Sequence, residues 1–210
     1  MNHRHIAMTA VITGGVLLLS ACTGNRTVSG TPSASLSPTV ATTDVPNSGA
    51  PKVENPLPAK VLDGSPCDSA LTPQQLTDFI GETTRAAIPK TDALGTACDW
   101  GNPDTGAGFN IGYQTRSDQG LSLTYKNAKP DSARWVELDP VQSYPAVAYV
   151  AKGLNVAKKQ DCVIVVGISD NLAYSISLTI GDNAVRQGKD ACLLGRDVAD
   201  AVMTNLKARA

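Results

Sequence analysis

The stretch CVIVVGI-SDN-LAYSISLTI, residues 162–180, decides the fold. Two runs rich in β-branched residues, Cys162–Ile168 and Leu172–Ile180, flank the turn residues Ser169–Asn171. This pattern predicts a β-hairpin, and the alternation in its second arm predicts a strand with one buried face. The residues expected on that face are Leu172, Tyr174, Ile176, Leu178 and Ile180.

Outward from this hairpin, helices are expected at both ends of the domain. Thr72-Pro73-Gln74-Gln75 has the spacing of a capping box, which predicts a helix over Pro73–Ile80 that ends at Gly81. An apolar stripe at helical spacing predicts a second helix from about Asp190 to Lys207. Leu121–Asn127 fits either a helix or a strand.

Short strands fill the space between these helices. Turn-forming residues separate them at Asn102–Gly106 and at Asp139-Pro140. We therefore predict an α+β fold: a single domain with a mainly antiparallel β-sheet, an N-terminal helix, a C-terminal helix and two disulfides. The further strands are expected at Ala97–Trp100, Phe109–Tyr113, Trp135–Leu138 and Ala146–Val150.

The first residues have the pattern of a bacterial lipoprotein signal. A short basic start with Arg4 precedes the apolar run Ile6–Leu19, and Leu19-Ser20-Ala21-Cys22 follows as a lipobox. Fourteen residues give roughly 21 Å of helix, which is too short for a hydrocarbon core of about 30 Å. We therefore expect residues 1–21 to be a cleaved signal peptide and Cys22 to carry diacylglyceryl and N-acyl groups.

Residues 22–64 are expected to form a lipidated, disordered stalk, and residues 65–210 the disulfide-bonded domain. Between Thr23 and Ala50 there are eleven Ser or Thr, three Pro, three Gly and only two charged residues. Such a composition buries too little apolar surface to offset the entropy of ordering. A flexible coil of about 40 residues would span on the order of 35 Å, and its Thr-Pro and Ser-Pro pairs suit O-glycosylation.

The expected mature chain contains no histidine, because His3 and His5 both precede Cys22. This excludes Ser-His-Asp and Cys-His catalysis and zinc sites ligated by histidine. Residues 1–21 hold one of the 18 basic residues and none of the 19 acidic ones, so the mature charge is −2. This balance gives no reason to expect a nucleic-acid partner.

Four cysteines follow Cys22, an even number that predicts disulfides in an exported chain. Four cysteines allow three connectivities. We favour Cys67–Cys98 and Cys162–Cys192, because each closes a loop of about 30 residues within one half of the domain. A Cys₄ zinc site is the alternative, but no two cysteines have the close C-x₂-C spacing of such sites, so no metal is predicted.

Three aromatic residues form a candidate contact surface: Trp135, Tyr144 and Tyr149. Trp135 fits a core position or a partly exposed one equally well. The chain contains no G-x-S-x-G or S-x-x-K motif, so these serine hydrolase classes have no support. A hydrolase would need two carboxylates in one cleft, and the candidate acids are Glu82, Asp99, Asp118, Glu137 and Asp139. We expect neither catalysis nor a cofactor.

The cysteines and their surroundings resemble a family of actinobacterial lipoproteins that carry a domain of unknown function, family 3558. The likeness rests on Pro66-Cys67, Cys98-Asp99-Trp100 and Tyr144-Pro145-Ala146, with Cys162 before a hairpin and Cys192 opening the last helix. The resemblance implies an envelope-exposed, disulfide-bonded domain and supplies no catalytic residues. The layout is also similar to extracellular sensor domains of actinobacterial receptor kinases.

We therefore expect a lipoprotein on the extracytoplasmic face of the cell membrane. Its expected role is a non-catalytic binding or sensing module of the cell envelope, with a protein, glycan or lipid partner. The alternatives are a lipid or glycolipid carrier and a carboxylate-based hydrolase. A carrier predicts a deep apolar cavity, on the order of several hundred Å³.

Overall fold

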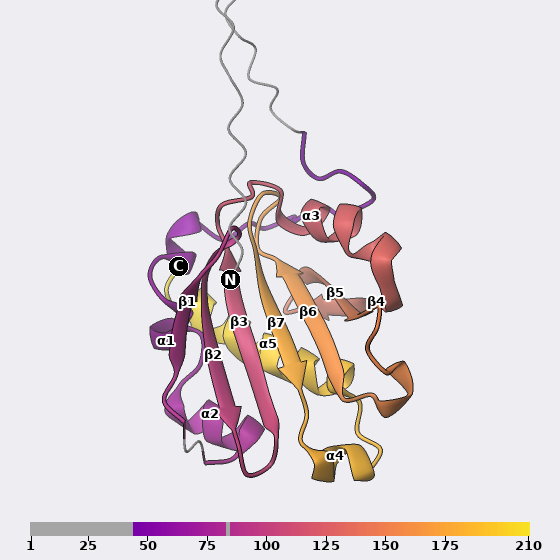
Figure 1. The fold of residues 1–210 in the computed structure, drawn as a ribbon. Coiled ribbons are helices and arrows are strands. Elements are labelled where there is room, and N and C mark those ends of the chain that lie inside the picture. Colours follow the sequence, from indigo (N-terminus) through magenta and orange to yellow (C-terminus); the bar gives the residue numbers. More distant parts are fainter. Residues whose placement is uncertain (1–43, 83–84) are drawn as a thin grey trace, which may run out of the picture. The chain divides into compact units, whose positions relative to one another are not determined.

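A seven-stranded antiparallel sheet is the centre of the computed structural model, which describes residues 44–82 and 85–210 (Figure 1). The strand order is β1-β2-β3-β7-β6-β5-β4. The predicted hairpin supplies strands β6 and β7, which lie near the middle of the sheet. The strands are β1 (Ile88–Thr91), β2 (Gly95–Asn102), β3 (Ala107–Gln114), β4 (Ser132–Val141), β5 (Tyr144–Ala151), β6 (Asp161–Gly167) and β7 (Ala173–Thr179).

Two strand groups build the sheet. Strands β1 to β3 and strands β4 to β7 each run as successive antiparallel neighbours, and the pairing of β3 with β7 joins the groups. The chain crosses from one group to the other through α3. The helices are η1 (Ala59–Leu62), α1 (Pro66–Ser69), α2 (Pro73–Ile80), α3 (Gly120–Asn127), η2 (Lys129–Asp131), η3 (Val156–Lys158), α4 (Asp182–Arg186) and α5 (Ala191–Lys207).

Both predicted terminal helices are present. Helix α2 begins and ends at the predicted residues, with Thr72 and Gln75 making the reciprocal hydrogen bonds of a capping box. Helix α5 begins after Asp190, whose carboxylate accepts a hydrogen bond from the backbone N–H of Cys192. The same carboxylate forms an ion pair with Arg134 of β4 at 2.7 Å, so the start of α5 is fixed to the far edge of the sheet.

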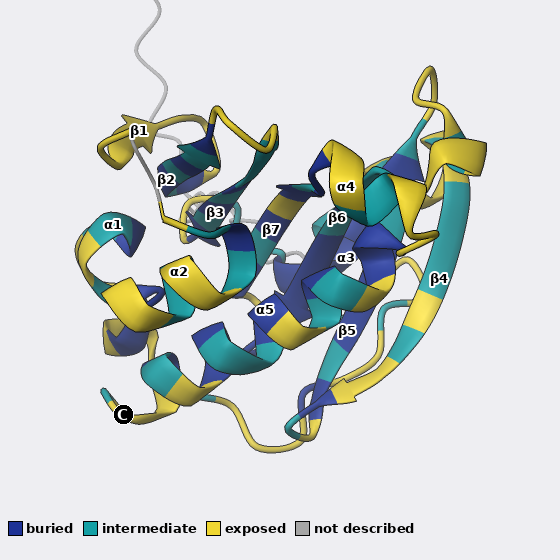
Figure 2. Cartoon of the chain, turned by 90° about the horizontal axis from the view of Figure 1, so that it is seen from below, coloured by how far each residue is buried: buried dark blue, intermediate teal, exposed yellow. Residues whose placement is uncertain are grey.

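The main core lies between one face of the sheet and α5. Tyr174, Ile176 and Leu178 of β7 point into it, as the alternation predicts. The α5 stripe that meets them includes Val198, Val202 and Leu206. Exposed residues collect on the edge strands β1 and β4 and on the outer sides of the helices (Figure 2). The predicted α+β fold class is confirmed.

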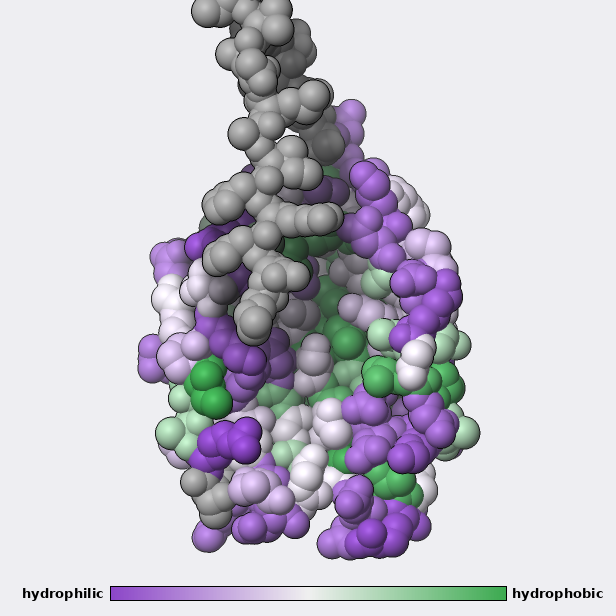
Figure 3. Space-filling model, in the orientation of Figure 1, coloured by the Kyte–Doolittle hydropathy of each residue, from purple (hydrophilic) through white to green (hydrophobic). Residues whose placement is uncertain are grey.

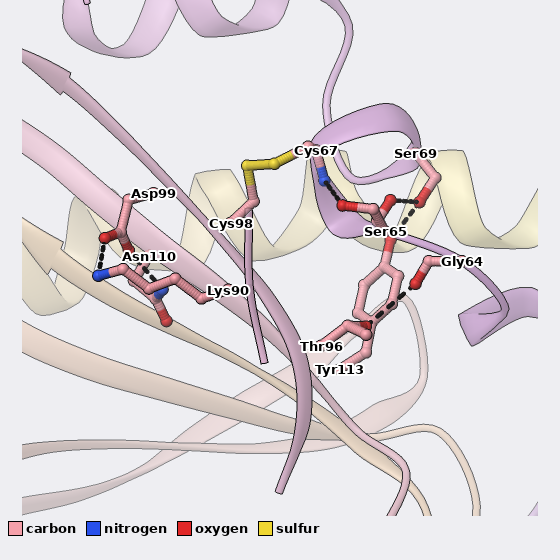
Figure 4. The surroundings of a disulfide bond; sticks show 10 residues. All are labelled: Gly64, Ser65, Cys67, Ser69, Lys90, Thr96, Cys98, Asp99, Asn110 and Tyr113. Carbon is pink, nitrogen blue, oxygen red and sulfur yellow. Dashed lines mark hydrogen bonds and ion pairs between the residues drawn. A yellow bond between two sulfur atoms is a disulfide. The ribbon is translucent and has the colours of Figure 1, made fainter. Parts of the chain in front are cut away.

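Two disulfides fasten helices to the sheet, and both predicted pairings are confirmed. Cys67 of α1 is bonded to Cys98 of β2, with their Cα atoms 5.2 Å apart (Figure 4). Cys162 of β6 is bonded to Cys192 at the start of α5, with a Cα–Cα distance of 5.1 Å. Each bridge therefore joins a helix to a neighbouring strand across the core.

The predicted boundary between stalk and domain at residue 64 is wrong, because residues 44–64 belong to the folded unit. Val53, Val61 and Leu62 are buried in the main core. The backbone N–H of Val53 donates to Asp170, and that of Leu57 donates to the carbonyl of Ile168. The composition of the whole segment is polar, but these few apolar residues are enough to dock it.

The turn between β4 and β5 also differs from the expectation. It lies at Gln142-Ser143, both with positive φ, rather than at Asp139-Pro140. Pro140 is part of β4, an edge strand, where a proline can be accommodated without losing a ladder hydrogen bond. The pairing of β4 and β5 shifts register between Leu138 and Val141, next to this proline.

Candidate binding site on the open face of the sheet

The two faces of the sheet are covered unequally. Helices α1, α2 and α5 pack on the face that carries the main core. The opposite face carries α3, whose Leu121 and Tyr125 form a second, smaller cluster with Val147, Val165 and Ala173. We call this second face the open face, because much of it beside α3 is exposed at the molecular surface (Figure 3). It mixes hydrophilic residues with separate patches of hydrophobic ones.

A hollow of about 420 Å³ lies on the open face beside α3, and we refer to it as the α3 hollow. Its floor comes from β6 and β7, where alternation places Ser175 and Ser177 opposite the core residues of β7. One wall comes from α3, and another from the turn between β1 and β2. The lining residues are Asp92, Leu94, Asn110, Gln114, Leu123, Thr124, Asn127, Ala128, Tyr149, Val163, Val165, Ser175 and Ser177.

Two smaller hollows continue the α3 hollow across the open face. One of about 360 Å³ extends over β2 and β3, and one of about 210 Å³ extends toward β5 and Leu154. Ser177 lines all three hollows, so its strand β7 is their common floor. The three hollows therefore adjoin one another over β7, and we refer to them together as the depression; the buried side chain of Gln114 lines its α3 hollow.

Two glycines of β3 leave the floor of this depression without side chains at their positions. Gly108 and Gly112 alternate with the core residues of β3 and so face the depression. A Cβ at Gly112 would lie 3.1 Å from the hydroxyl oxygen of Ser175, and one at Gly108 would lie 2.7 Å from the carbonyl oxygen of Trp100. Larger residues at these positions would raise or displace the floor.

Gln114 is the most unusual residue of the α3 hollow. Its side chain is 5% exposed, and its Oε1 atom is buried without a hydrogen-bond partner among the described residues. Buried side-chain oxygens are nearly always hydrogen-bonded in proteins, so an unpartnered one calls for an explanation. It follows Gly112 by two positions in β3 and lies on the same face, toward the hollow.

An aromatic cluster stands at the side of the α3 hollow. Trp135 of β4 and Tyr149 of β5 are direct cross-strand partners, with their rings stacked at 6.1 Å. Tyr125 of α3 meets Trp135 edge-on at 5.1 Å. Lys129 lies over the rings of Tyr125 and Trp135, at 4.7 and 5.3 Å from their centres, and pairs with Glu137 at 3.0 Å.

These neighbours perturb two pKa values. Burial, with the nearby Glu137 carboxylate as a second cause, raises the pKa of Tyr125 to about 12. Hydrogen bonding and attraction from Lys129 lower the pKa of Glu137. Glu137 is therefore held as a carboxylate against a lysine, and this exposed ion pair joins η2 to β4.

The structure brings together two of the three aromatic residues predicted as a contact surface. Trp135 and Tyr149 are stacked and half-buried, and Tyr149 lines the α3 hollow. Tyr144 is 6% exposed and belongs to the main core on the opposite face. Placing Tyr144 in the same surface was therefore wrong, because five positions along a strand reverse the side on which a residue points. Cys22 lies outside the described residues.

Among the described residues, none of the three hollows on the open face is lined by two of the candidate acids. Asp99 is bound by Lys90 and accepts a hydrogen bond from Asn110 (Figure 4), while Glu137 is bound by Lys129. Within residues 44–82 and 85–210, no group of three or more Cys, Asp or Glu side chains is placed to hold a metal ion. In the same part of the chain, no helix has the length and apolarity needed to span a bilayer.

A family model described as "Protein of unknown function (DUF3558)" matches residues 17–205. The chain belongs to this family. The match covers nearly the whole sequence, including all four bridged cysteines, so the predicted membership of family 3558 is confirmed. No curated protein and no solved structure matches this DUF3558 chain.

Most of the α3 hollow has no direct signal in the sequence. Asn110, Gln114 and Ser177 are ordinary polar residues of strands, and only the register of β3 against β7 pairs Asn110 with Ser177. The alternation of serine with apolar residues in β7 is visible, but it indicates only a solvent-facing side.

Proposed function

We propose that this DUF3558 protein is a non-catalytic binding module of the cell envelope that engages its partner through the open face of the sheet. The observation that carries the proposal is the set of adjoining hollows over β7: Gln114, whose Oε1 atom has no partner among the described residues, and Tyr149 both line the α3 hollow. Ligand sites are concave and combine apolar walls with a few polar groups, as this depression does.

The lipobox supports a location at the membrane surface. Acylation of Cys22 would anchor the protein, since each buried CH₂ contributes about 0.8 kcal/mol to membrane binding. Metabolic labelling with radioactive palmitate tests this part of the proposal. We expect label on the wild-type protein and none on Cys22→Ala, which should also leave the membrane fraction. An unlabelled wild-type protein would refute the anchor.

The placement of the acids supports a binding role over hydrolysis. A general acid in a glycosidase needs a raised pKa and a second carboxylate within about 10 Å across a cleft. Glu137 has a lowered pKa, and Asp99 is bound by Lys90 and Asn110. Of the candidate acids, only Asp99 is among the residues that line the hollows of the open face.

A lipid carrier is the second candidate, and one apolar hollow favours it. This hollow of about 280 Å³ lies between α2, α4 and α5, and Phe79, Ile180 and Leu194 are among its lining residues. Sites for drug-sized ligands are usually about 300–1,000 Å³, so this one suits at most a short chain. Native mass spectrometry of the purified protein distinguishes the candidates, because a carrier retains lipid and would show a mass above that of the polypeptide.

Binding to isolated envelopes tests the main proposal. Ser177→Trp would fill the centre of the depression at an exposed position. The matched control is Gln74→Trp, an exposed site on α2, behind the sheet. We expect Ser177→Trp to lower the amount of protein retained by washed envelopes at least tenfold, while Gln74→Trp behaves as wild type. Equal retention of all three proteins would refute binding through the open face.

A further inference from the structure

We propose that the α3 hollow binds a neutral carbohydrate, because its lining combines side-chain amides, hydroxyls and the ring of Tyr149 with the buried Gln114, whose Oε1 atom has no hydrogen-bond partner among the described residues. This inference rests on the proposed binding function and adds the chemical class of the ligand. Four features of the hollow carry it: the absence of basic residues, the kind of polar group, the aromatic wall and the pairing of the floor strands.

The lining contains no lysine or arginine among the described residues. The single charged side chain is Asp92, whose Oδ1 already accepts hydrogen bonds from the backbone N–H groups of Leu94 and Gly95. The nearby Arg116 donates to the backbone carbonyl of Asp92 and is outside the lining. Phosphate and carboxylate groups would find no cation here, so a neutral ligand fits best.

Amides and hydroxyls are the groups that match sugar hydroxyls, because both can donate and accept hydrogen bonds. The hollow offers the amides of Gln114, Asn127 and Asn110, of which Asn110 already donates one N–H to Asp99, and the hydroxyls of Thr124, Ser175 and Ser177. The terminal amide of a glutamine turns readily about its last torsion. A ligand hydroxyl in the hollow could thus become the partner that Gln114 lacks.

Tyr149 supplies the apolar contact. Sugar rings carry C–H groups on their faces, and these pack against aromatic rings. Tyr149 is held by the stack with Trp135, so its ring is already oriented when a ligand arrives. A ring that is fixed before binding loses little freedom on binding.

The sheet itself argues against an extended peptide as the ligand. Peptides that bind to sheets usually add a strand to a free edge. The floor strands β6 and β7 are each paired on both sides, β7 with β3 and β6, and β6 with β5 and β7. Their backbone groups are therefore already used, and recognition over this floor must come from side chains.

Isothermal titration calorimetry on the full-length protein tests the proposal. The protein is purified from membranes in a detergent without a sugar headgroup and titrated with neutral oligomers of glucose, galactose and mannose. A sulfated form of each oligomer and an uncharged peptide of similar size serve as the other ligands. We expect saturable binding of at least one neutral oligomer and weaker or no binding of its sulfated form and of the peptide.

Two variants connect the binding to the hollow. Gln114→Leu keeps the volume of the side chain and removes its amide, so it should weaken the binding at least tenfold while raising the thermal midpoint of unfolding. Gln74→Leu, on exposed α2, should change neither the binding nor the fold. If Gln114→Leu fails to fold, Asn127→Ala on the exposed end of α3 takes its place, with the same expected loss of affinity.

The outcomes separate the ligand class from the binding function. The proposal of a neutral carbohydrate would be overturned if the sulfated oligomer or the peptide bound more strongly than the neutral oligomer. It would also be overturned if Gln114→Leu bound the neutral oligomer with full affinity. Absence of any binding to neutral oligomers, with retention on envelopes that is still sensitive to Ser177→Trp, would overturn the carbohydrate class alone. If the protein neither binds the neutral oligomers nor shows envelope retention that depends on Ser177, the binding function is overturned as well.

Discussion

Gly120 allows α3 to approach the turn between β6 and β7. Its φ is +47°, and a Cβ there would lie 2.6 Å from the carbonyl oxygen of Asp170. Gly120→Ala should therefore lose about 2–3 kcal/mol of unfolding free energy, since the side chain meets backbone that cannot rotate away. Urea unfolding followed by tryptophan fluorescence measures this loss.

Gly106 provides the matched control, because it has a positive φ of 70° but a Cβ there would have no atom within 4 Å. Gly106→Ala should lose only the cost of a left-handed residue, about 1 kcal/mol. Equal losses for the two variants would show that α3 does not depend on the close approach at Gly120.

The hydroxyl of Tyr174 ties the centre of the sheet to α5. It is fully buried and donates a 2.7 Å hydrogen bond to the carbonyl oxygen of Ala199. Tyr174→Phe should lower the unfolding free energy by about 1 kcal/mol without altering the fold. An unchanged denaturation midpoint, with an unchanged circular dichroism spectrum, would contradict this.

The contact residues could be predicted from the sequence only in part. Trp135 and Tyr149 were predicted as candidate contact residues, but their stacking depends on the register of β4 against β5. Gln114 could not be singled out, because its burial and lack of a partner arise from packing. Polarity alone does not distinguish a buried glutamine from a solvated one.

At the scale of elements, the capped helix α2 was easier to predict than the edge strand β1. The start of α2 is specified by the local contacts of Thr72 and Gln75, so it could be predicted from four residues. Strand β1 was not predicted, because Ile88–Thr91 contains a proline and all four residues are exposed, which leaves no alternation to detect. Edge strands owe their conformation to one neighbour, here β2.

The two disulfides should stabilise the fold by similar amounts through chain entropy, since they span 31 and 30 residues. Each is expected to contribute about 3–4 kcal/mol. Replacing Cys162 and Cys192 by alanine should cost more than replacing Cys67 and Cys98, because both Cys162 and Cys192 are buried whereas Cys67 is only half-buried.

Denaturant titrations of the two double variants, each compared with the wild-type protein, measure this difference. The Cys67→Ala, Cys98→Ala variant should unfold at the higher denaturant concentration of the two. The reverse order would mean that α1 depends more on its bridge than α5 does, despite the longer packed interface of α5.

At the scale of the whole molecule, the segment 44–64 links α3 to the main core. The backbone N–H of Asn47 donates to the hydroxyl of Ser122 on α3, and that of Val53 donates to Asp170, in the turn against which α3 packs. Val61, further along the segment, is buried in the main core.

All five tyrosines have raised pKa values, and burial is the main cause at each. In the unfolded chain they ionise near pH 10, whereas Tyr125 in the folded protein ionises at about 12. Above about pH 10 the unfolded state therefore loses protons that the folded state retains, so the tyrosines make stability fall with rising pH. Below this pH both states are protonated, and the tyrosines add no pH dependence.

Absorbance at 295 nm tests this expectation directly. At about pH 10.5, the native protein should show much less phenolate than the same protein unfolded in guanidinium chloride. As the pH rises further, the remaining phenolate should appear together with the loss of the circular dichroism signal, because Tyr174 is fully buried and can ionise only when the sheet separates from α5. Native and unfolded proteins with the same phenolate content at about pH 10.5 would show that the aromatic rings are open to solvent. The packing of both faces of the sheet would then be looser than the structure requires.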